Sequence, residues 1–311
     1  MKPFAIVASI VIIFVCLVYA LNGPWETQPL DSEPRIVALE GVGSVVVSSE
    51  ISSVRITTAD TAELTARLSG NDAGLFGPAV LDVTNANGQV RVRAHRQRGL
   101  SLFNIGSLAL EITLPNNYSG TLDVSASAGS VRVEGGLRVQ SLRLKSSAGS
   151  VNVDDVIAEK GIEISSSAGS VRAGKLAGAD INLHSSAGSI RVDSCEAAGL
   201  IRLQSSAGSI DASDVSGAVD AHSSASSVTL RMRDVKANVK ADSSAGGVRV
   251  SIPADAAADV DLSTSAGNAS VNGLSVDISQ QKRGLLRGKL NGGGPTVTLH
   301  SSASSVELSA N

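Results

Sequence analysis

A six-residue motif, Ser-Ser-Ala-Gly-Ser-Val, recurs with small variations about every 20 residues and limits the folds that this chain can adopt. Its alanine stands at Ala128, Ala148, Ala168, Ala187, Ala207, Ala225, Ala245, Ala266 and Ala303. The spacings are 20, 20, 19, 20, 18, 20, 21 and 37 residues, so the last one reads as one repeat plus an insertion. A period of this length is typical of proteins in which each repeat packs only on its neighbours.

Apolar residues fall at fixed positions around each alanine. The position six residues before it holds Leu122, Leu142, Ile162, Ile181, Ile201, Val219, Val239, Val260 and Val297. The position three residues after it holds Val131, Val151, Val171, Ile190, Ile210, Val228, Val248, Ala269 and Val306. Apolar positions alternate with polar ones, which is the period of a strand with one buried face. Each repeat therefore predicts two short strands, joined by the Ser-Ala-Gly-Ser corner and by a second, more variable corner.

The composition of the first corner fits a turn that stacks on an identical turn about 4.8 Å away. Glycine supplies unusual backbone angles, and alanine and serine add little bulk inside the bend. The serine hydroxyls can bond backbone groups of the same turn or of a neighbouring one. A ladder of serines with a functional role is the alternative interpretation.

A column of charged residues tests the stacking independently. Five residues before the alanine stand Asp123, Arg143, Glu163, Asn182, Arg202, Asp220, Lys240 and Asp261, and neighbours in this series never share a sign. Such alternation is expected when successive repeats lie directly beside each other. A second column is less regular, because it makes Arg172 and Arg191 neighbours. The sequence thus predicts an all-β fold, a single-chain β-solenoid with coils of about 20 residues.

The first 21 residues are expected to act in export. Residues 4–21 are almost entirely apolar, and at about 1.5 Å per helical residue they are just long enough to cross a bilayer. Lys2 favours an N-terminus on the inner side of the membrane. The favoured interpretation is an uncleaved transmembrane helix, and the alternative is a signal peptide cleaved after Ala20. The domain is therefore expected at the cell membrane, facing the periplasm or the cell surface, or secreted if the signal is cleaved.

The rest of the chain divides into three parts. Residues 22–35 are polar, contain prolines and predict a linker between the membrane and the domain. Residues 36–120 alternate less regularly and predict the first coils and a cap, whereas 121–311 hold the regular repeats with an insertion near 274–296. Irregular terminal coils are expected, because an exposed solenoid edge would pair with other chains.

Three segments carry a resemblance to a known family. They are 109–115 (ALEITLP), 122–133 (LDVSASAGSVRV) and 288–308 (GKLNGGGPTVTLHSSASSVEL). In this order, with S-S-A-G-S-V repeated between them, they resemble the putative adhesin family of bacterial β-strand-repeat domains, and the match extends over residues 36–311. The resemblance implies a domain of the cell envelope and brings no catalytic residues.

Patterns typical of catalytic or metal sites are scarce. Cys195 is the only cysteine outside the apolar N-terminal segment, so no internal disulfide and no cysteine-based metal site is expected. His184, His222 and His300 share one repeat position, but the first two are separated by a coil, about 10 Å apart, which is too far for a shared zinc ion. After Tyr118 the chain has no aromatic residue on which sugars or nucleobases could stack. We expect no enzyme, cofactor, metal or nucleic-acid partner; a carbohydrate-cleaving β-helix is the alternative.

Two basic clusters are candidate binding sites. The first holds Arg91, Arg93, His95, Arg96 and Arg98, and the second holds Lys282, Arg283, Arg287 and Lys289. Either could bind anionic envelope polymers or lipid headgroups, and the alternative is a solvated loop. The glycine-rich stretch 291–295 (NGGGP) lacks the Lys-Ser/Thr of a P-loop and predicts a loop or bulge.

These patterns favour a non-catalytic module of the cell envelope or surface for adhesion, binding or assembly. The expected partners are the membrane, through the N-terminal segment, and envelope proteins or anionic envelope polymers. The alternative is a regulatory or sensory ectodomain that binds an envelope protein or a stress ligand.

Overall fold

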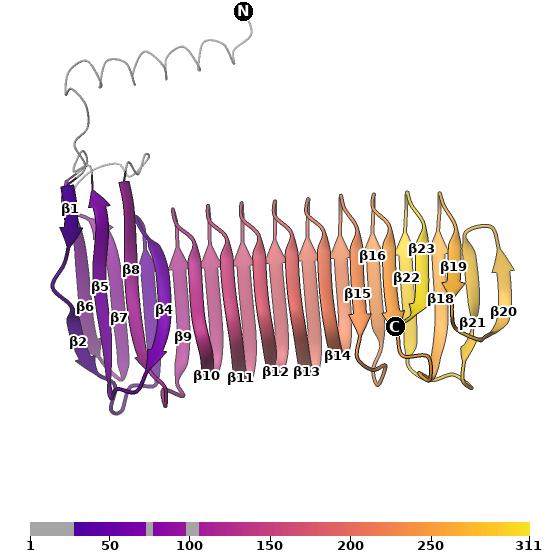
Figure 1. The fold of residues 1–311 in the computed structure, drawn as a ribbon, viewed down its shortest axis with the longest axis horizontal. Helices are drawn as coiled ribbons and strands as arrows, with labels where there is room; N and C mark the ends of the chain where they lie inside the picture. Colours follow the sequence, from indigo (N-terminus) through magenta and orange to yellow (C-terminus); the bar gives the residue numbers. More distant parts are fainter. Residues whose placement is uncertain (1–27, 73–76, 98–105) are drawn as a thin grey trace, which may run out of the picture.

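The computed structural model describes residues 28–72, 77–97 and 106–311 of the 311-residue chain. In this part the chain forms 23 strands and is all-β. A search of the same residues finds no helix that could cross a membrane. The predicted anchor or signal peptide over 1–21 lies outside the described residues. Figure 1 shows an elongated rod, in which successive strands lie side by side along the long axis.

The middle of the rod is a stack of parallel strands, one coil beside the next. Its strands are β9 (Thr121–Ala126), β10 (Val131–Ser146), β11 (Val151–Ser166), β12 (Val171–Ser185), β13 (Ile190–Ser205) and β14 (Ile210–Ser223). Val131 pairs with Val151, and Val151 pairs with Val171, so each coil lies one repeat further along the rod. The in-register stacking expected from the repeat is confirmed here.

The core runs through the centre of the stack. Every second side chain of a strand points inward, as in β9, whose burial alternates from residue to residue. Val131, Val151, Val171, Ile190 and Ile210 form one continuous buried row, and each is fully shielded from solvent. Burying a side chain of this size stabilises the fold by about 1.5–3 kcal/mol. The apolar positions predicted from the repeat are therefore the core.

The variable corner differs from its prediction, because it contains a third short parallel segment. Leu137 pairs with Val156, and Val156 pairs with Leu176, and all three side chains are buried. The ladder between β10 and β11 shifts register just before and just after this segment, between Val133 and Gly136 and again between Val139 and Ser141. A coil of this part of the rod thus has three sides, not the predicted two strands.

The first serine of each turn is buried and bonds two turns at once. The buried members of this column are Ser146, Ser166, Ser185, Ser205, Ser223, Ser243 and Ser301. Ser185 Oγ accepts a hydrogen bond from the Gly188 N–H at 2.9 Å and donates one to the Gly169 carbonyl of the preceding turn, also at 2.9 Å. The backbone role expected for the serines is therefore confirmed, and burial removes this column from the functional serine ladder considered as an alternative.

The glycine of the turn is required for close stacking and not, as predicted, for unusual backbone angles. None of the turn glycines has a positive φ. A Cβ atom added to Gly169 would lie 2.4 Å from the carbonyl oxygen of Gly149 in the preceding turn. Because real Cβ atoms do not approach a backbone this closely, a larger residue would push the two turns apart.

The charged column pairs across coils as expected over most of the rod. Arg143 Nη2 lies 2.7 Å from Glu163 Oε2 on the next coil, and Arg202 lies 4.0 Å from Asp220. The predicted order fails at the far end, because Lys240 is followed in the stack by Thr298 and only then by Asp261. The sequence could not show that a later coil is inserted between these two.

The N-terminal cap is built out of sequence order. Its strands are β1 (Gln28–Asp31), β2 (Arg35–Ala38), β3 (Ser44–Ser49), β4 (Ser53–Ala59), β5 (Glu63–Asp72), β6 (Ala79–Ala86), β7 (Gln89–Arg96) and β8 (Gly106–Pro115). The coil of β3 and β4 lies between a coil of β7 and β8 and the coil of β9 and β10. Antiparallel β6 and β5 then cover β7 and β8. Strands β1 and β2 pair with β5, so the predicted linker over 22–35 contains strand from Gln28 onward.

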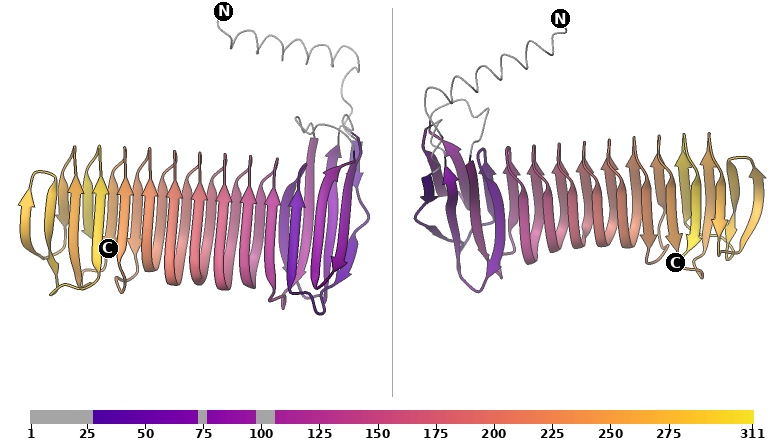
Figure 2. Two further views of the ribbon diagram at one scale, coloured as in Figure 1. Left: turned by 180° about the vertical axis from the view of Figure 1, so that it is seen from behind. Right: turned by 45° about the horizontal axis from the view of Figure 1, so that its top comes forward.

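The other end of the rod repeats this arrangement. Its strands are β15 (Val228–Met232), β16 (Val239–Ser243), β17 (Val248–Ile252), β18 (Ala258–Thr264), β19 (Ala269–Asn272), β20 (Val276–Lys282), β21 (Leu285–Leu290), β22 (Thr296–Ser301) and β23 (Val306–Ala310). The last coil, β22 and β23, is inserted between the coils β16–β17 and β18–β19. The predicted insertion near 274–296 contains the β20–β21 hairpin, which pairs antiparallel with β18. Both views in Figure 2 place this hairpin at the opposite end from the cap.

The buried serine column generates a stability prediction. We expect Ser185→Ala to lower the free energy of unfolding by about 1–3 kcal/mol, because it leaves a buried N–H and a buried carbonyl without their partner. The exposed neighbour Ser186 provides a matched control, and Ser186→Ala should change the same quantity by less than about 0.5 kcal/mol. Urea unfolding followed by circular dichroism measures both.

The variant is expected to fold, since Ala126 occupies the equivalent buried position in the turn after β9. Equal effects of the two substitutions would contradict a structural role for the buried hydroxyl.

Candidate functional site

The first basic cluster lies on β7 in the N-terminal cap and is partly neutralised. Arg91, Arg93 and His95 alternate along one side of the strand. Arg93 Nη2 lies 2.6 Å from Glu50 Oε1, and the carboxylate raises the pKa of this guanidinium. Arg91 donates a hydrogen bond to Gln89 Oε1 at 3.0 Å and is exposed. Of these three side chains, Arg91 is therefore the one best placed for an anionic partner.

Arg96 belongs to the interior of the cap and not to a basic surface. Its side chain is only 5% exposed, and its Nη2 lies 2.7 Å from Asp72 Oδ1. Its Nη1 donates a second hydrogen bond, of 2.8 Å, to the Gly77 carbonyl. A buried ion pair of this kind is costly to break, since it would leave one charge without its partner. Arg98 lies outside the described residues.

The second basic cluster lies on the β20–β21 hairpin, at the other end of the rod (Figure 1). Lys282 and Arg283 are exposed at the turn of the hairpin. Arg287 and Lys289 lie on the outward side of β21, and Arg287 Nε is 3.1 Å from Asp261 Oδ2 on β18. The two predicted clusters thus do not meet, and Arg287, like Arg93, has an acidic partner.

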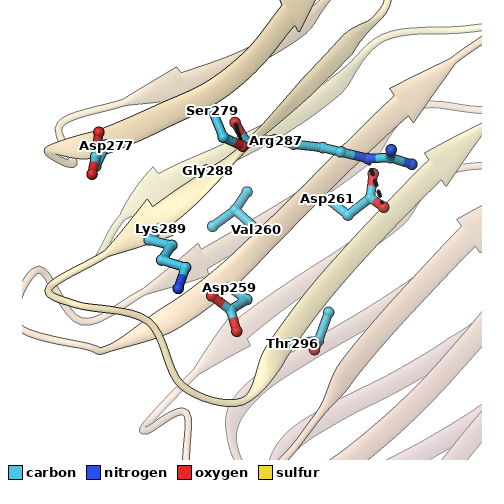
Figure 3. Close-up of a pocket in the computed structure, with 9 residues that line it drawn as sticks. All are labelled: Asp259, Val260, Asp261, Asp277, Ser279, Arg287, Gly288, Lys289 and Thr296. Atoms are coloured by element: carbon cyan, nitrogen blue, oxygen red, sulfur yellow. Dashed lines mark hydrogen bonds and ion pairs between the residues drawn. The ribbon is translucent and has the colours of Figure 1, made fainter.

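A hollow of about 540 Å³ lies on the outward side of this hairpin, as Figure 3 shows. Its lining is Asp259, Val260, Asp261, Asp277, Ser279, Arg287, Gly288, Lys289 and Thr296. The strand register places Lys289 between Asp259 on β18 and Asp277 on β20. Three carboxylates and two basic groups therefore share the hollow, so its charge is mixed and not basic. The charge-alternating column of the sequence already included Asp261, the partner of Arg287.

The glycine-rich stretch after β21 forms a tight turn, as its sequence predicts. Asn291, Gly292 and Gly293 all have positive φ angles, of 47°, 91° and 88°. A Cβ atom added to Gly293 would lie 2.7 Å from Asp259 Oδ1, so the turn packs closely over this carboxylate. Its glycines are explained by backbone geometry and this contact.

In the histidine column, the strand pairing brings together residues that the sequence order did not show as neighbours. His184 and His222 are separated by Gln204, as expected. Because the last coil is inserted, however, Asp242 pairs with His222 on one side and with His300 on the other. His222 and His300 each form a hydrogen bond of 3.4 Å with the serine two residues later, in the turn that follows the strand. A search of the described residues finds no group of three side chains that could hold a metal ion.

An ion-pair network centred on Arg233 links three successive coils. It lies where the parallel segments of the third side end. Arg233 Nη1 lies 2.8 Å from Glu196 Oε2, and Arg233 Nε donates a hydrogen bond of 2.7 Å to Asp214 Oδ1. Ser194 Oγ donates to the other oxygen of Asp214 at 2.8 Å. These bonds lower the pKa of Asp214 to about 2, mainly through Arg233. No sequence pattern indicated this network, because its members come from three different repeats.

Cys195 is part of the core of the third side. The side chain is fully buried between Leu176 and Val215 in the ladder, and the thiol is free. Burial raises its pKa to about 12. Since the thiolate is the reactive form of cysteine, this thiol serves as an apolar packing group.

The Arg233 network generates a prediction on pH. Because the pKa of Asp214 is lowered on folding, its ion pair stabilises the fold above the ordinary carboxyl pKa, near 4, and is lost as the pH falls toward 2. We expect Asp214→Asn to lower the free energy of unfolding at neutral pH, and the difference from the unaltered protein to shrink between about pH 4 and pH 2. Urea unfolding at a series of pH values measures this difference.

Asparagine suits the backbone at this position, whose φ is 51°. Asp193→Asn, at an exposed position of the preceding coil, is the control. A difference for Asp214→Asn that does not change with pH would contradict the assignment.

Comparison with solved structures finds chains with a similar fold. The chain is similar to a putative adhesin from Parabacteroides merdae, with 12% identity and a TM-score of 0.52 over 92% of this chain and 97% of that chain. It is also similar to a putative adhesin from Parabacteroides distasonis, with 11% identity and a TM-score of 0.48 over 91% of this chain and 98% of that one. No curated protein matches the chain. The likeness at these identities concerns the fold.

The family is established from the sequence. The profile described as Toastrack DUF4097 matches residues 42–309, which is most of the chain. The resemblance to putative adhesins is thereby confirmed, and the chain belongs to the Toastrack DUF4097 family.

Proposed function

We propose that the stacked coils are the turns of one β-solenoid, and that the protein is a non-catalytic module of the cell envelope or surface, used in adhesion, binding or assembly. The family and the likeness to the Parabacteroides merdae putative adhesin support a surface module. The specific role in adhesion or assembly is an inference from the surface of the rod.

The observation that carries this proposal is the regularity of that surface. Exposed residues recur in columns along the rod, such as Ser147, Ser167, Ser186 and Ser206 at the turns. Each column repeats the same chemical group at a spacing of about 4.8 Å. A partner that is itself repetitive or extended can make many weak contacts with such a surface, and their combined strength then exceeds that of any single contact. A polymer or another macromolecular surface fits this arrangement better than a small molecule.

The acidic and basic groups favour a structural role over catalysis. Arg143, Arg202 and Arg249 have carboxylates of neighbouring coils within 4.0 Å. A catalytic site instead needs titratable groups that converge on a substrate. We infer that these side chains stabilise the stack and present a surface of mixed charge.

Two further parts of the proposal rest on the sequence. The apolar segment over 1–21 is proposed to anchor the chain in the membrane, with the domain exported. Anionic envelope polymers are proposed to bind those exposed side chains of the two basic clusters that have no acidic partner within 4.0 Å in the described part of the chain. These are Arg91, Lys282, Arg283 and Lys289.

Export can be tested with the full chain carrying an epitope tag after Asn311, which is exposed. We expect a protease added to intact cells, or to cells whose outer barrier has been opened, to remove the tag while a cytoplasmic marker stays protected. A tag that is cut only after the inner membrane is lysed would contradict the proposed location.

Polymer binding can be tested at the hairpin turn. We expect the double variant Lys282→Glu, Arg283→Glu to weaken retention of the full chain on isolated envelope polymers several-fold at low salt, and the effect to vanish as salt screens the charges. The control Arg138→Glu, Lys160→Glu makes the same charge change at exposed positions on the third side. If both double variants weaken retention equally, the hairpin is not the binding site.

A further inference from the structure

The chain enters the rod at a defined edge of the cap. Gln28, the first residue of β1, pairs with Asp72 of β5, and Asp72 pairs with Gly106 of β8. Ser53 directly follows a turn and pairs with Ala109, so Ala109 lies at the level of the turns. Gly106 precedes Ala109 by three residues and therefore lies three residues beyond this level. We call the edge that carries the Ser-Ser-Ala-Gly-Ser turns the turn edge. Three strand residues span about 10 Å, so the cap projects by this distance beyond the turn edge.

The connection to the proposed anchor is much shorter than the sequence suggested. Strand pairing begins at Gln28, whereas the linker was expected to continue to residue 35. Only residues 22–27 remain between the apolar segment over 1–21 and β1. Six residues reach at most about 20 Å even when they are fully extended. If the first 21 residues span the membrane, the projecting edge of the cap lies within this distance of the lipid surface.

The two long edges of the rod differ in charge. The regular turns at 147–150, 167–170, 186–189, 206–209, 224–227, 244–247 and 302–305 contain no acidic or basic residue. The opposite edge is formed by the third side and by the loops that continue it after β15 and β17. It has ten acidic residues: Glu134, Asp154, Asp155, Glu159, Asp180, Asp193, Glu196, Asp214, Asp234 and Asp255. It has six basic residues, Arg138, Lys160, Lys175, Arg231, Arg233 and Lys236. The side with excess negative charge is therefore the one that an anionic lipid surface repels.

We propose that the rod lies along the membrane with its turn edge toward the lipid surface and its acidic third side facing away. This inference rests on the proposed membrane anchorage. The short connection brings the cap to the bilayer, and the difference in charge selects the edge that faces it. The two long sides between these edges then remain open to partners, and the third side is the most distant from the membrane.

Paired cysteine labels can test this orientation in the full chain. Cys16→Ser removes the cysteine of the apolar segment, and Cys195 is buried. A fluorophore is placed at Ser147→Cys, Ser206→Cys or Ser302→Cys on the turn edge, and at Lys160→Cys, Asp193→Cys or Asp255→Cys on the opposite side. All six positions are exposed. The protein is reconstituted into vesicles of phosphatidylcholine and phosphatidylglycerol that carry a quencher on the lipid headgroup.

We expect each turn-edge label to be quenched at least about twofold more strongly than its partner, because a strand of six residues separates the two edges by about 20 Å. Equal quenching within every pair, falling from residue 147 to residue 302, would show an upright rod and overturn the proposal. Vesicle flotation separates the two levels of inference. Flotation without quenching at either edge would support the anchor and contradict the proposed orientation. A protein that does not float would contradict both the anchor and the orientation.

A lengthened connection provides a second variant with the same fold. About fifteen Gly and Ser residues inserted after Asn22 extend the reach of the connection several-fold. We expect the difference in quenching within each pair to decrease, with flotation unchanged. An unchanged difference would show that the short connection does not hold the cap at the lipid surface.

Discussion

The stack depends on one contact, in which a turn bonds to the identical turn beside it. The buried serine hydroxyl accepts from its own turn and donates to the preceding one, as Ser166 does with Gly169 and with the carbonyl of Gly149. The absent side chain of the glycine lets the two backbones approach. Because both partners of this contact come from the same motif, every coil provides the site on which the next one can stack. The register of the apolar core and of the charged columns follows from it.

The end coils of a stack expose unpaired backbone groups, and such an open edge would pair with another chain. Both ends of this rod use the same solution. At each end, a coil that is out of sequence order is inserted beside the outermost coil. Antiparallel strands then pair with the outermost coil. At the far end β22 and β23 pair with coils on both sides, so the final strands of the chain are held by two ladders. β22 and β23 are therefore interior parts of the stack, and unwinding cannot begin there without breaking both ladders.

The sequence predicted the features that repeat and missed those that do not. The turn motif, the inward rows and the parallel register follow from local period, and all are present. The repeat cannot predict the order of the coils, because β22 has the same pattern of apolar and polar positions wherever it is inserted. The third segment of each coil is too short to show an alternation, with Leu137 and Val139 as its only inward residues in β10. The burial of Arg96 depends on Asp72, a residue 24 positions away, so its charge alone pointed wrongly to the surface.

The uniformity that hides the coil order also limits where this protein can be selective. A column of equivalent groups presents the same chemistry at every coil, so it can strengthen binding without distinguishing one position from another. Discrimination must then come from places where the repetition stops. In the described chain these are the cap with Arg91, the hairpin with its mixed-charge hollow, and the third side, whose residues vary from coil to coil. Anchoring the rod at its cap would leave the hairpin and the third side free, and there a partner would meet a surface that is not repeated elsewhere on the molecule.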